Sequence, residues 1–210
     1  MTDDDRHRFE RLALPHLDAA YNLARWLTRD DQDAQDVVQE AVLRALRYFA
    51  GFRGEQARPW LLQIVRHTTW SWLERNRPGE VVPFDEALHD DGGPDAGTGA
   101  WGLAAPPSPE PSAVMARHAD RVRVHAALSA LPIVFREALV LRELEDLSYQ
   151  EIARIADVPV GTVMSRLSRG RALLRRALAP DARPVLRPVP SPASPPAPAP
   201  APFTGQGGTR

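Results

Sequence analysis

The chain has 210 residues, of which 43% are hydrophobic and 25% charged, and its formal net charge is −1. This composition is ordinary for a folded chain of one or two modest domains, and no window is apolar enough to suggest membrane insertion. The absence of cysteine excludes disulfides, thiol redox chemistry and cysteine-ligated zinc. The charged N-terminal stretch MTDDDRHRFE lacks the apolar core of a signal peptide, so we expect a cytoplasmic protein.

Proline and glycine divide the chain into four parts. Two helix-rich blocks, 8–78 and 113–179, flank a segment dense in Gly, Pro and Asp at 79–112, and a proline-rich tail occupies 180–210. The sequence therefore predicts an all-α fold of two small helical domains joined by a flexible linker. The repetitive tail cannot bury a core and is expected to be disordered, although a proline-motif ligand for another protein is the alternative.

In the first block, apolar residues from Phe9 to Leu27 recur at helical spacing, and Pro15 is expected to separate a short leading turn from the main helix. After a polar turn at 28–31, a second helix is predicted over 33–46. Val37 and Ala41 fall on its core face. The opposite face carries a crowded set of hydrogen-bonding groups: Asp36, Gln39, Glu40 and Arg44.

A loop is predicted from Phe49 to Pro59, and a third helix from Trp60. Its expected core residues are Leu61, Ile64, Val65 and Trp72, whereas Arg66, His67, Trp70 and Arg77 are expected to point outward. An exposed aromatic ring among basic residues suits stacking on an unpaired nucleobase. For His67, a position in the core is the alternative.

The second block contains a pattern typical of a helix-turn-helix module between Leu147 and Leu178. Ser148 is a good N-cap with Glu151 three residues later, which predicts a capping box at the start of the first helix. Pro159 forces its preceding residue out of the helical region, so the turn is short, and Gly161 and Thr162 can open the second helix.

The second helix is predicted to be amphipathic. Val163 and Leu167 are predicted to face the core, while the other face carries Thr162, Ser165, Arg166 and Arg169 at helical spacing. From 160 to 179 the chain has five arginines and no acidic residue, so this face can enter a major groove and attract phosphates. An amphipathic hairpin with a solvated basic face is the alternative.

Together the segments DAQDVVQEAVLRAL, FRGEQARPWLLQIVRH and LSALPIVFREALVLRELEDLSYQEIARIADVPVGTVMSRL resemble the extracytoplasmic-function (ECF) group of bacterial sigma factors in the sigma-70 family. Such proteins carry sigma regions 2 and 4 and little else. The resemblance implies that 8–78 is region 2 and 113–179 is region 4.

The resemblance also implies roles for the candidate residues. The helix over 33–46 would dock on core RNA polymerase through Asp36, Gln39, Glu40 and Arg44. The loop and helix that follow would capture and help melt the minus-10 element, with candidates Phe52, Arg53, Arg66, His67 and Trp70. Thr162, Ser165, Arg166 and Arg169 would contact the minus-35 element.

Some positions depart from the family pattern. His67, Ser71 and Glu74 stand where the family commonly has asparagine, an acidic residue and arginine, which leaves the minus-10 preference open. Met164 stands where a basic residue is frequent. Gly170 lies inside the second helix, where glycine costs up to about 1 kcal/mol relative to alanine.

No glycine-rich phosphate loop, nucleophile elbow or metal-ligand spacing is present, so we expect neither an enzyme nor a bound metal or cofactor. The expected partners are core RNA polymerase, promoter DNA and an anti-sigma factor. A stand-alone helix-turn-helix regulator and a protein-interaction adaptor are the alternative functions. The sequence names neither the promoters nor the inducing signal.

Overall fold

The computed structural model describes residues 3–54, 56–80 and 111–179. Most of the predicted linker and the whole predicted tail lie outside these ranges. All regular elements within them are helical, which confirms the all-α prediction. They are α1 (Asp3–Leu12), η1 (Leu14–His16), α2 (Leu17–Thr28), α3 (Asp31–Tyr48), η2 (Phe49–Gly51), α4 (Ala57–Asn76), η3 (Pro78–Glu80), α5 (Pro111–Ala130), α6 (Ile133–Leu139), the π-helical turn η5 (Val140–Leu144), α7 (Tyr149–Ala156) and α8 (Val160–Leu178).

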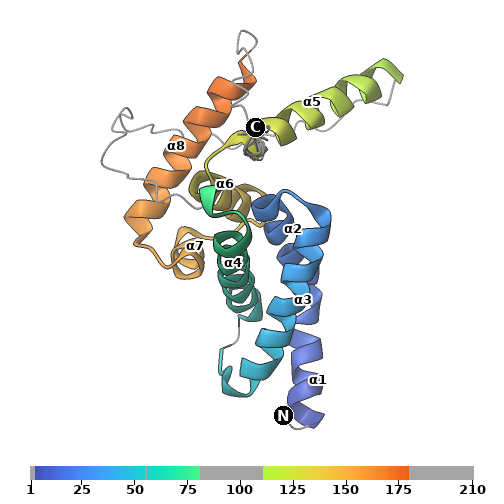
Figure 1. Cartoon of the computed structure of the whole chain (residues 1–210), viewed down its shortest axis with the longest axis vertical. Coiled ribbons are helices and arrows are strands. Elements are labelled where there is room, and N and C mark those ends of the chain that lie inside the picture. The colour runs from blue at the N-terminus through green and yellow to red at the C-terminus, as the bar shows by residue number, and fades with distance from the viewer. Residues whose placement is uncertain (1–2, 55, 81–110, 180–210) are drawn as a thin grey trace, which may run out of the picture.

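The first block is a bundle in which α2, α3 and α4 pack against one another, with α1 extending beside α3 (Figure 1). Leu23 and Leu27 of α2, Val37 of α3 and Leu61 of α4 are fully buried between them. At the far end, the ring of Phe9 meets Phe49 edge-on at 5.2 Å between centroids. The apolar stripes predicted from the sequence therefore form one core.

The joints of this bundle follow from local chemistry. The three residues around Pro15 form the short 3-10 turn η1, as the proline predicted. Arg29 adopts a left-handed conformation at φ 59°, and the Asp30 side chain then accepts hydrogen bonds from the Gln32 and Asp33 amides. Because Asp30 is the N-cap, α3 begins two residues before the predicted start at 33.

The predicted loop from Phe49 to Pro59 is shorter in the structure. Its first residues form the 3-10 turn η2, and α4 begins at Ala57 rather than at Trp60. Pro59 lies in the first turn of α4, where a helix has no partner for the backbone N–H that proline lacks. The proline is therefore part of the helix and not a barrier before it.

The second block is built on α6, which packs against α8, while α7 and α8 pack as a pair. Its core includes Leu139, Ile152, Ile155, Val163 and Leu167, all at most 2% exposed. The close approach of α6 and α8 is made at Gly170: a Cβ there would lie 3.1 Å from Leu139 Cδ1 and 3.4 Å from Phe135 Cβ. Gly170 thus has a packing role that the sequence did not reveal.

The two blocks are in contact with each other. Helix α4 packs against α7, and α2 packs against α6, so that α6 lies between the first bundle and α8 (Figure 1). Helix α5 projects away from the body in the same view.

Candidate nucleic-acid and polymerase interfaces

The α7–α8 unit has the helix-turn-helix geometry that the sequence predicts. The capping box is present: the Ser148 backbone N–H donates to Glu151 Oε2 at 2.8 Å, and the Glu151 amide donates to Ser148 Oγ at 3.3 Å. The hydrogen bonds from the Ser148 side chain and backbone hold the pKa of Glu151 below its usual value. Asp157 then turns the chain in a left-handed conformation, with φ 54°.

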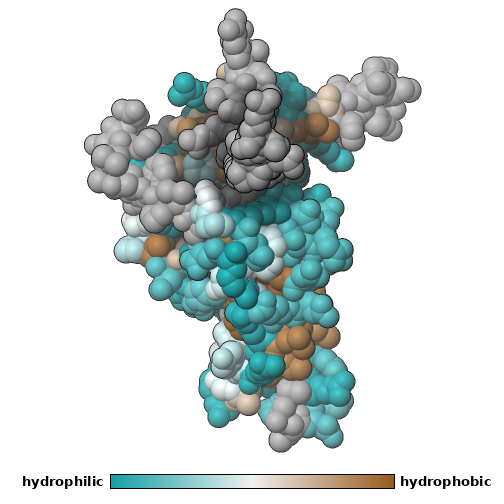
Figure 2. Space-filling model, viewed as in Figure 1, coloured by the Kyte–Doolittle hydropathy of each residue, from teal (hydrophilic) through white to brown (hydrophobic). Residues whose placement is uncertain are grey.

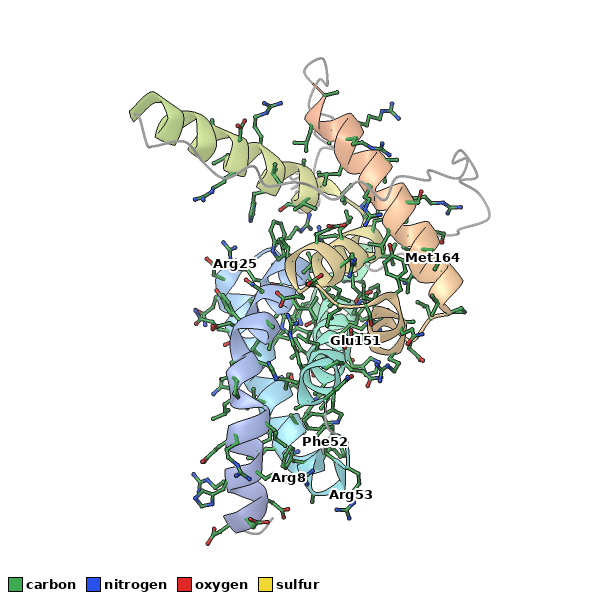
Figure 3. The ribbon with its side chains drawn as sticks, turned by 180° about the vertical axis from the view of Figure 1, so that it is seen from behind. Arg8, Arg25, Phe52, Arg53, Glu151 and Met164 are labelled. Carbon is green, nitrogen blue, oxygen red and sulfur yellow. The ribbon has the colours of Figure 1, made fainter. Side chains whose placement is uncertain are left out.

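Helix α8 begins at Val160, with Pro159 as its N-cap, so Gly161 and Thr162 lie in its first turn, close to the predicted opening of the helix. The four candidate DNA contacts Thr162, Ser165, Arg166 and Arg169 are all partly exposed, on the face away from buried Val163 and Leu167. Met164 is 50% exposed beside them (Figure 3). The fold thus leaves this surface of α8 reachable by a partner.

One arginine of α8 is already engaged by the same block. The Arg171 guanidinium donates to Glu143 Oε1 from both Nε and Nη2, at 3.1 and 2.7 Å. This ion pair, in which two guanidinium N–H groups share one carboxylate oxygen, joins α8 to η5, so Arg171 already has an acidic partner within its own block.

The candidate polymerase-binding face lies on α3. Asp36 and Gln39 are exposed, while Glu40 and Arg44 form an ion pair one turn apart. Arg44 also donates to Thr68 Oγ1 of α4 at 3.5 Å. The structure therefore brings all four predicted residues to one accessible side of α3.

Two apolar side chains accompany this face and were not predicted. Leu43 is 54% exposed and Tyr48 is 69% exposed, both on α3. Figure 2 shows a largely hydrophilic surface with a hydrophobic patch over its lower part, where α3 and α1 run. In the sequence, Leu43 and Tyr48 fall outside the core stripe of this helix, and that position could have indicated their exposure. Clusters of large exposed apolar side chains often mark binding sites.

Two of the minus-10 candidates lie in the turn before α4 but differ in accessibility. The Phe52 ring is only 8% exposed and packs against Trp60, with centroids 4.7 Å apart, and against Phe49. The Arg8 guanidinium covers this cluster, whereas Arg53 points away from the body (Figure 3). Phe52 is therefore packed into the core in this structure, and its role as a base contact stays a prediction.

The remaining candidates lie on α4. His67 is exposed, which decides against its alternative place in the core. Arg66 and Trp70 do not point to solvent as predicted: Arg66 Nε donates to Glu137 Oε1 at 2.9 Å, and Trp70 Nε1 donates to the same oxygen at 2.8 Å. Glu137 belongs to α6, so this contact was invisible to an analysis of α4 alone.

Arg77 is also not free to point outward. It donates to the Thr28 carbonyl at 2.6 Å and to Asp33 Oδ2 at 2.7 Å, and so ties the end of α4 to the turn between α2 and α3. In the described structure Arg77 therefore stabilises the packing of the first bundle.

Within the described residues, no group of three or more His, Cys, Asp or Glu side chains could hold a metal ion. The helices of that part of the chain also include none that is long and apolar enough to cross a bilayer.

Comparison with known protein families agrees with this geometry. Residues 12–78 match the family described as Sigma-70 region 2, and residues 121–174 match Sigma-70, region 4. The RNA polymerase sigma-H factor of Pseudomonas aeruginosa is 36% identical over 177 residues, covering 84% of this chain and 89% of that protein. The ECF RNA polymerase sigma-E factor of Escherichia coli is 37% identical over 152 residues, covering 70% and 75%.

Two solved structures share the fold at 23% sequence identity. One is the sigma factor RpoE of Bartonella quintana in complex with the anti-sigma factor NepR, with a TM-score of 0.58 and coverage of 86% of this chain and 100% of that chain. The other is CnrH in complex with the cytosolic domain of CnrY, with a TM-score of 0.56 and coverage of 84% and 91%.

The order of the two matched regions, the relatives and the helix-turn-helix geometry support one function over the stand-alone regulator. The chain belongs to the ECF group of the sigma-70 family and is a sigma factor that directs promoter-specific transcription initiation with RNA polymerase.

Proposed function

We propose that three surfaces of this sigma factor divide the work of initiation. The α3 surface of Asp36, Gln39, Glu40 and Arg44 docks on core polymerase. Arg53, Arg66, His67 and Trp70 contact the minus-10 element, and Thr162, Ser165, Arg166 and Arg169 contact the minus-35 element. The factor acts in the cytoplasm, and the chemistry of RNA synthesis belongs to the polymerase.

The observation that carries this proposal is the separation of charge between two accessible helix faces. Between Asp30 and Glu40 the sequence has acidic residues and no basic one, and Asp36 is exposed there on α3. From 160 to 178 it has five arginines and no acidic residue, all on α8. An acidic face and a basic face on one small protein suit two different partners, a protein and a nucleic acid.

The domain boundaries follow the same division. Residues 8–78 form region 2, residues 113–179 form region 4, and residues 79–112 link them. The described helices support these limits to within a few residues, since α1 begins earlier, at Asp3, and α5 at Pro111.

An anti-sigma factor is the proposed regulator. One solved neighbour is a sigma factor captured with an anti-sigma factor, and a second is held by a cytosolic partner domain. By analogy, a protein that binds between or around the two regions here would compete with polymerase for the α3 surface.

Co-elution with core RNA polymerase on size exclusion tests the docking surface. We expect the full chain to co-elute and the double variant Asp36→Ala/Glu40→Ala to dissociate. The matched control is Asp4→Ala/Asp18→Ala, which removes two exposed acids on α1 and α2, away from the α3 surface. Equal loss in both variants would assign the effect to net charge, and no loss in either would place the docking surface elsewhere.

A further inference from the structure

The exposed surface of α8 includes an apolar side chain that the basic composition of the helix does not explain. In this helix, which the structure describes throughout, two large apolar side chains are exposed: Met164 at 50% and Leu173 at 37%. Leu173 lies in the last two turns, whereas Met164 is in the second turn from the start (Figure 3). In a helix-turn-helix module, residues near the N-terminus of the second helix reach base edges. Met164 therefore lies where a side chain can contribute to sequence readout.

The neighbours of Met164 on the helix surface are small. Gly161 and Ser168 lie three residues before it and four residues after it, which places both beside it on the helix. A Cβ added to Gly161 would meet nothing within 4 Å, so the space on that side of Met164 is open. A partner can therefore approach the backbone of α8 closely at this point, where the thioether is the longest side chain of the three.

The two flanks of this surface differ in charge. Arg166 and Arg169 are three residues apart and lie on one flank. Arg171 lies seven residues after Met164, on the other flank, and its guanidinium donates twice to Glu143 Oε1. The positive charge nearest to Met164 along its flank is thus already paired with an acid of η5. Because a phosphate contact needs a cation, this flank suits an uncharged group better than it suits the DNA backbone.

One base presents an uncharged apolar group in the major groove. Thymine carries a C5-methyl group there, and the other three bases present hydrogen-bond donors and acceptors. The methionine side chain is unbranched and polarisable, so it adapts to the shape of an apolar group that it contacts. Removing one methyl group from water at such a contact corresponds to a change in affinity of about 3- to 10-fold.

We propose that Met164 contacts the methyl group of a thymine in the minus-35 element and so makes this factor prefer thymine at that position. The inference rests on the proposed function, because it takes the exposed surface of α8 to contact the minus-35 element. Arginine or lysine at position 164 would instead donate hydrogen bonds to a guanine. Met164 is therefore a specificity-determining residue, whereas a residue that contacts phosphate would strengthen binding to every sequence alike.

The test removes the methyl group from the DNA and the thioether from the protein. Holoenzyme assembled with the parent chain selects a minus-35 element from a randomised duplex library, and each thymine of that element is then replaced singly by deoxyuridine, which lacks only the methyl group. We expect one replacement to weaken binding about 3- to 10-fold with the parent chain and to have no effect with Met164→Ala. Leu173→Ala, which removes the other exposed apolar side chain of α8, should keep the sensitivity of the parent.

Several outcomes would overturn the inference. A selected element without thymine, an element in which no replacement has an effect, or an equal effect with Met164→Ala would each do so. Weaker co-elution of Met164→Ala with core polymerase would also do so, because Met164 would then contact a protein. Holoenzyme carrying Arg166→Ala distinguishes this inference from the proposed function. Weaker binding by Arg166→Ala without any sensitivity to deoxyuridine would overturn the role of Met164 alone, whereas unchanged binding by both variants would overturn both proposals.

Discussion

The two helices proposed to contact DNA present their surfaces in opposite ways. On α8, the side chains of Thr162, Ser165, Arg166 and Arg169 are partly exposed. On α4, Arg66 and Trp70 are also partly exposed, but both donate hydrogen bonds to a carboxylate of the other region. Both helices carry basic residues. The difference arises because α8 lies at the outside of its own bundle, while α4 lies between α3 and α7.

A basic residue on a polar helix face can still be engaged by a neighbouring helix, as Arg66 is by Glu137. The availability of α8 is set within region 4, by the core that buries its opposite face. The availability of α4 depends on the relative position of two regions that are far apart in sequence. Substitutions confined to one region should therefore affect α4 and α8 differently.

The largest effect is expected from Ile155→Ala, in the core of region 4. Ile155 is fully buried, so truncation should lower the free energy of unfolding by about 2–5 kcal/mol. Urea unfolding is followed by circular dichroism for all helices and by tryptophan fluorescence, since the described tryptophans Trp26, Trp60, Trp70 and Trp72 all belong to region 2.

We expect the helical signal of Ile155→Ala to gain an early phase while the main fluorescence transition stays in place, because Ile155 is buried within region 4 and the described tryptophans lie in region 2. A common shift of both signals would mean that the regions unfold as one unit. In that case a substitution in one region would affect α4 and α8 together.

The next effect is expected from Arg166→Ala on α8. Loss of this side chain should cost about 1–3 kcal/mol at one base position if it contacts a base edge, and should lower the salt dependence of binding if it contacts a phosphate. Binding of holoenzyme to duplexes with single substitutions in the minus-35 element distinguishes these results. Arg121→Ala, an exposed arginine of α5, is the control for charge.

A smaller effect concerns the start of α7. Ser148→Ala removes the N-cap and should cost about 0.5–2 kcal/mol of region 4 stability. Because hydrogen bonds from Ser148 lower the pKa of Glu151 in the folded chain, the stabilisation is complete above the ordinary carboxyl pKa and is lost as the pH falls through the lowered value.

Urea unfolding at neutral pH and at pH about 4 measures this dependence. The variant Glu151→Gln should show a smaller loss of stability on acidification than the parent chain. If acid weakened both equally, other carboxylates would account for the whole change and the capping box would have no part in it.

The smallest effect is expected from Gly170→Ala. Alanine gains up to about 1 kcal/mol of helix propensity, but its Cβ would sit 3.1 Å from Leu139 Cδ1, so the two contributions oppose each other. We expect a net change below about 1 kcal/mol in urea unfolding, and a loss of about 1–3 kcal/mol for Gly170→Val. Ala172→Gly, at an exposed site of the same helix, measures the propensity alone.

Local features were predictable from the sequence because their causes lie within a few residues. The capping box of Ser148 and Glu151, the break at Pro15 and the buried face of Val163 and Leu167 were all predicted and are present. Boundaries were less accurate where a cap was overlooked. Asp30 extended α3, and Pro59 joined the first turn of α4.

Features that depend on distant partners were not predictable. An aromatic residue after a glycine and before an arginine gave no sign that Phe52 would pack against Trp60, or that Arg8 would cover Phe49 and Phe52. Arg66 and Trp70 both donate to Glu137, which is 71 and 67 residues away in sequence. Nothing in the local sequence around Glu137 distinguishes it from an exposed acidic residue. Periodicity identifies the polar side of a helix but not what lies against it.

The position of α6 has a consequence for how far apart two DNA sites can lie. This seven-residue helix touches α8 at Gly170 on one side and receives the donors of α4 at Glu137 on the other. While those contacts hold, the separation and angle of α4 and α8 are fixed by the width of a single helix. Since we propose that α4 and α8 contact the two promoter elements, we expect different promoter spacings to be accommodated only when the contacts at Glu137 and Glu145 break.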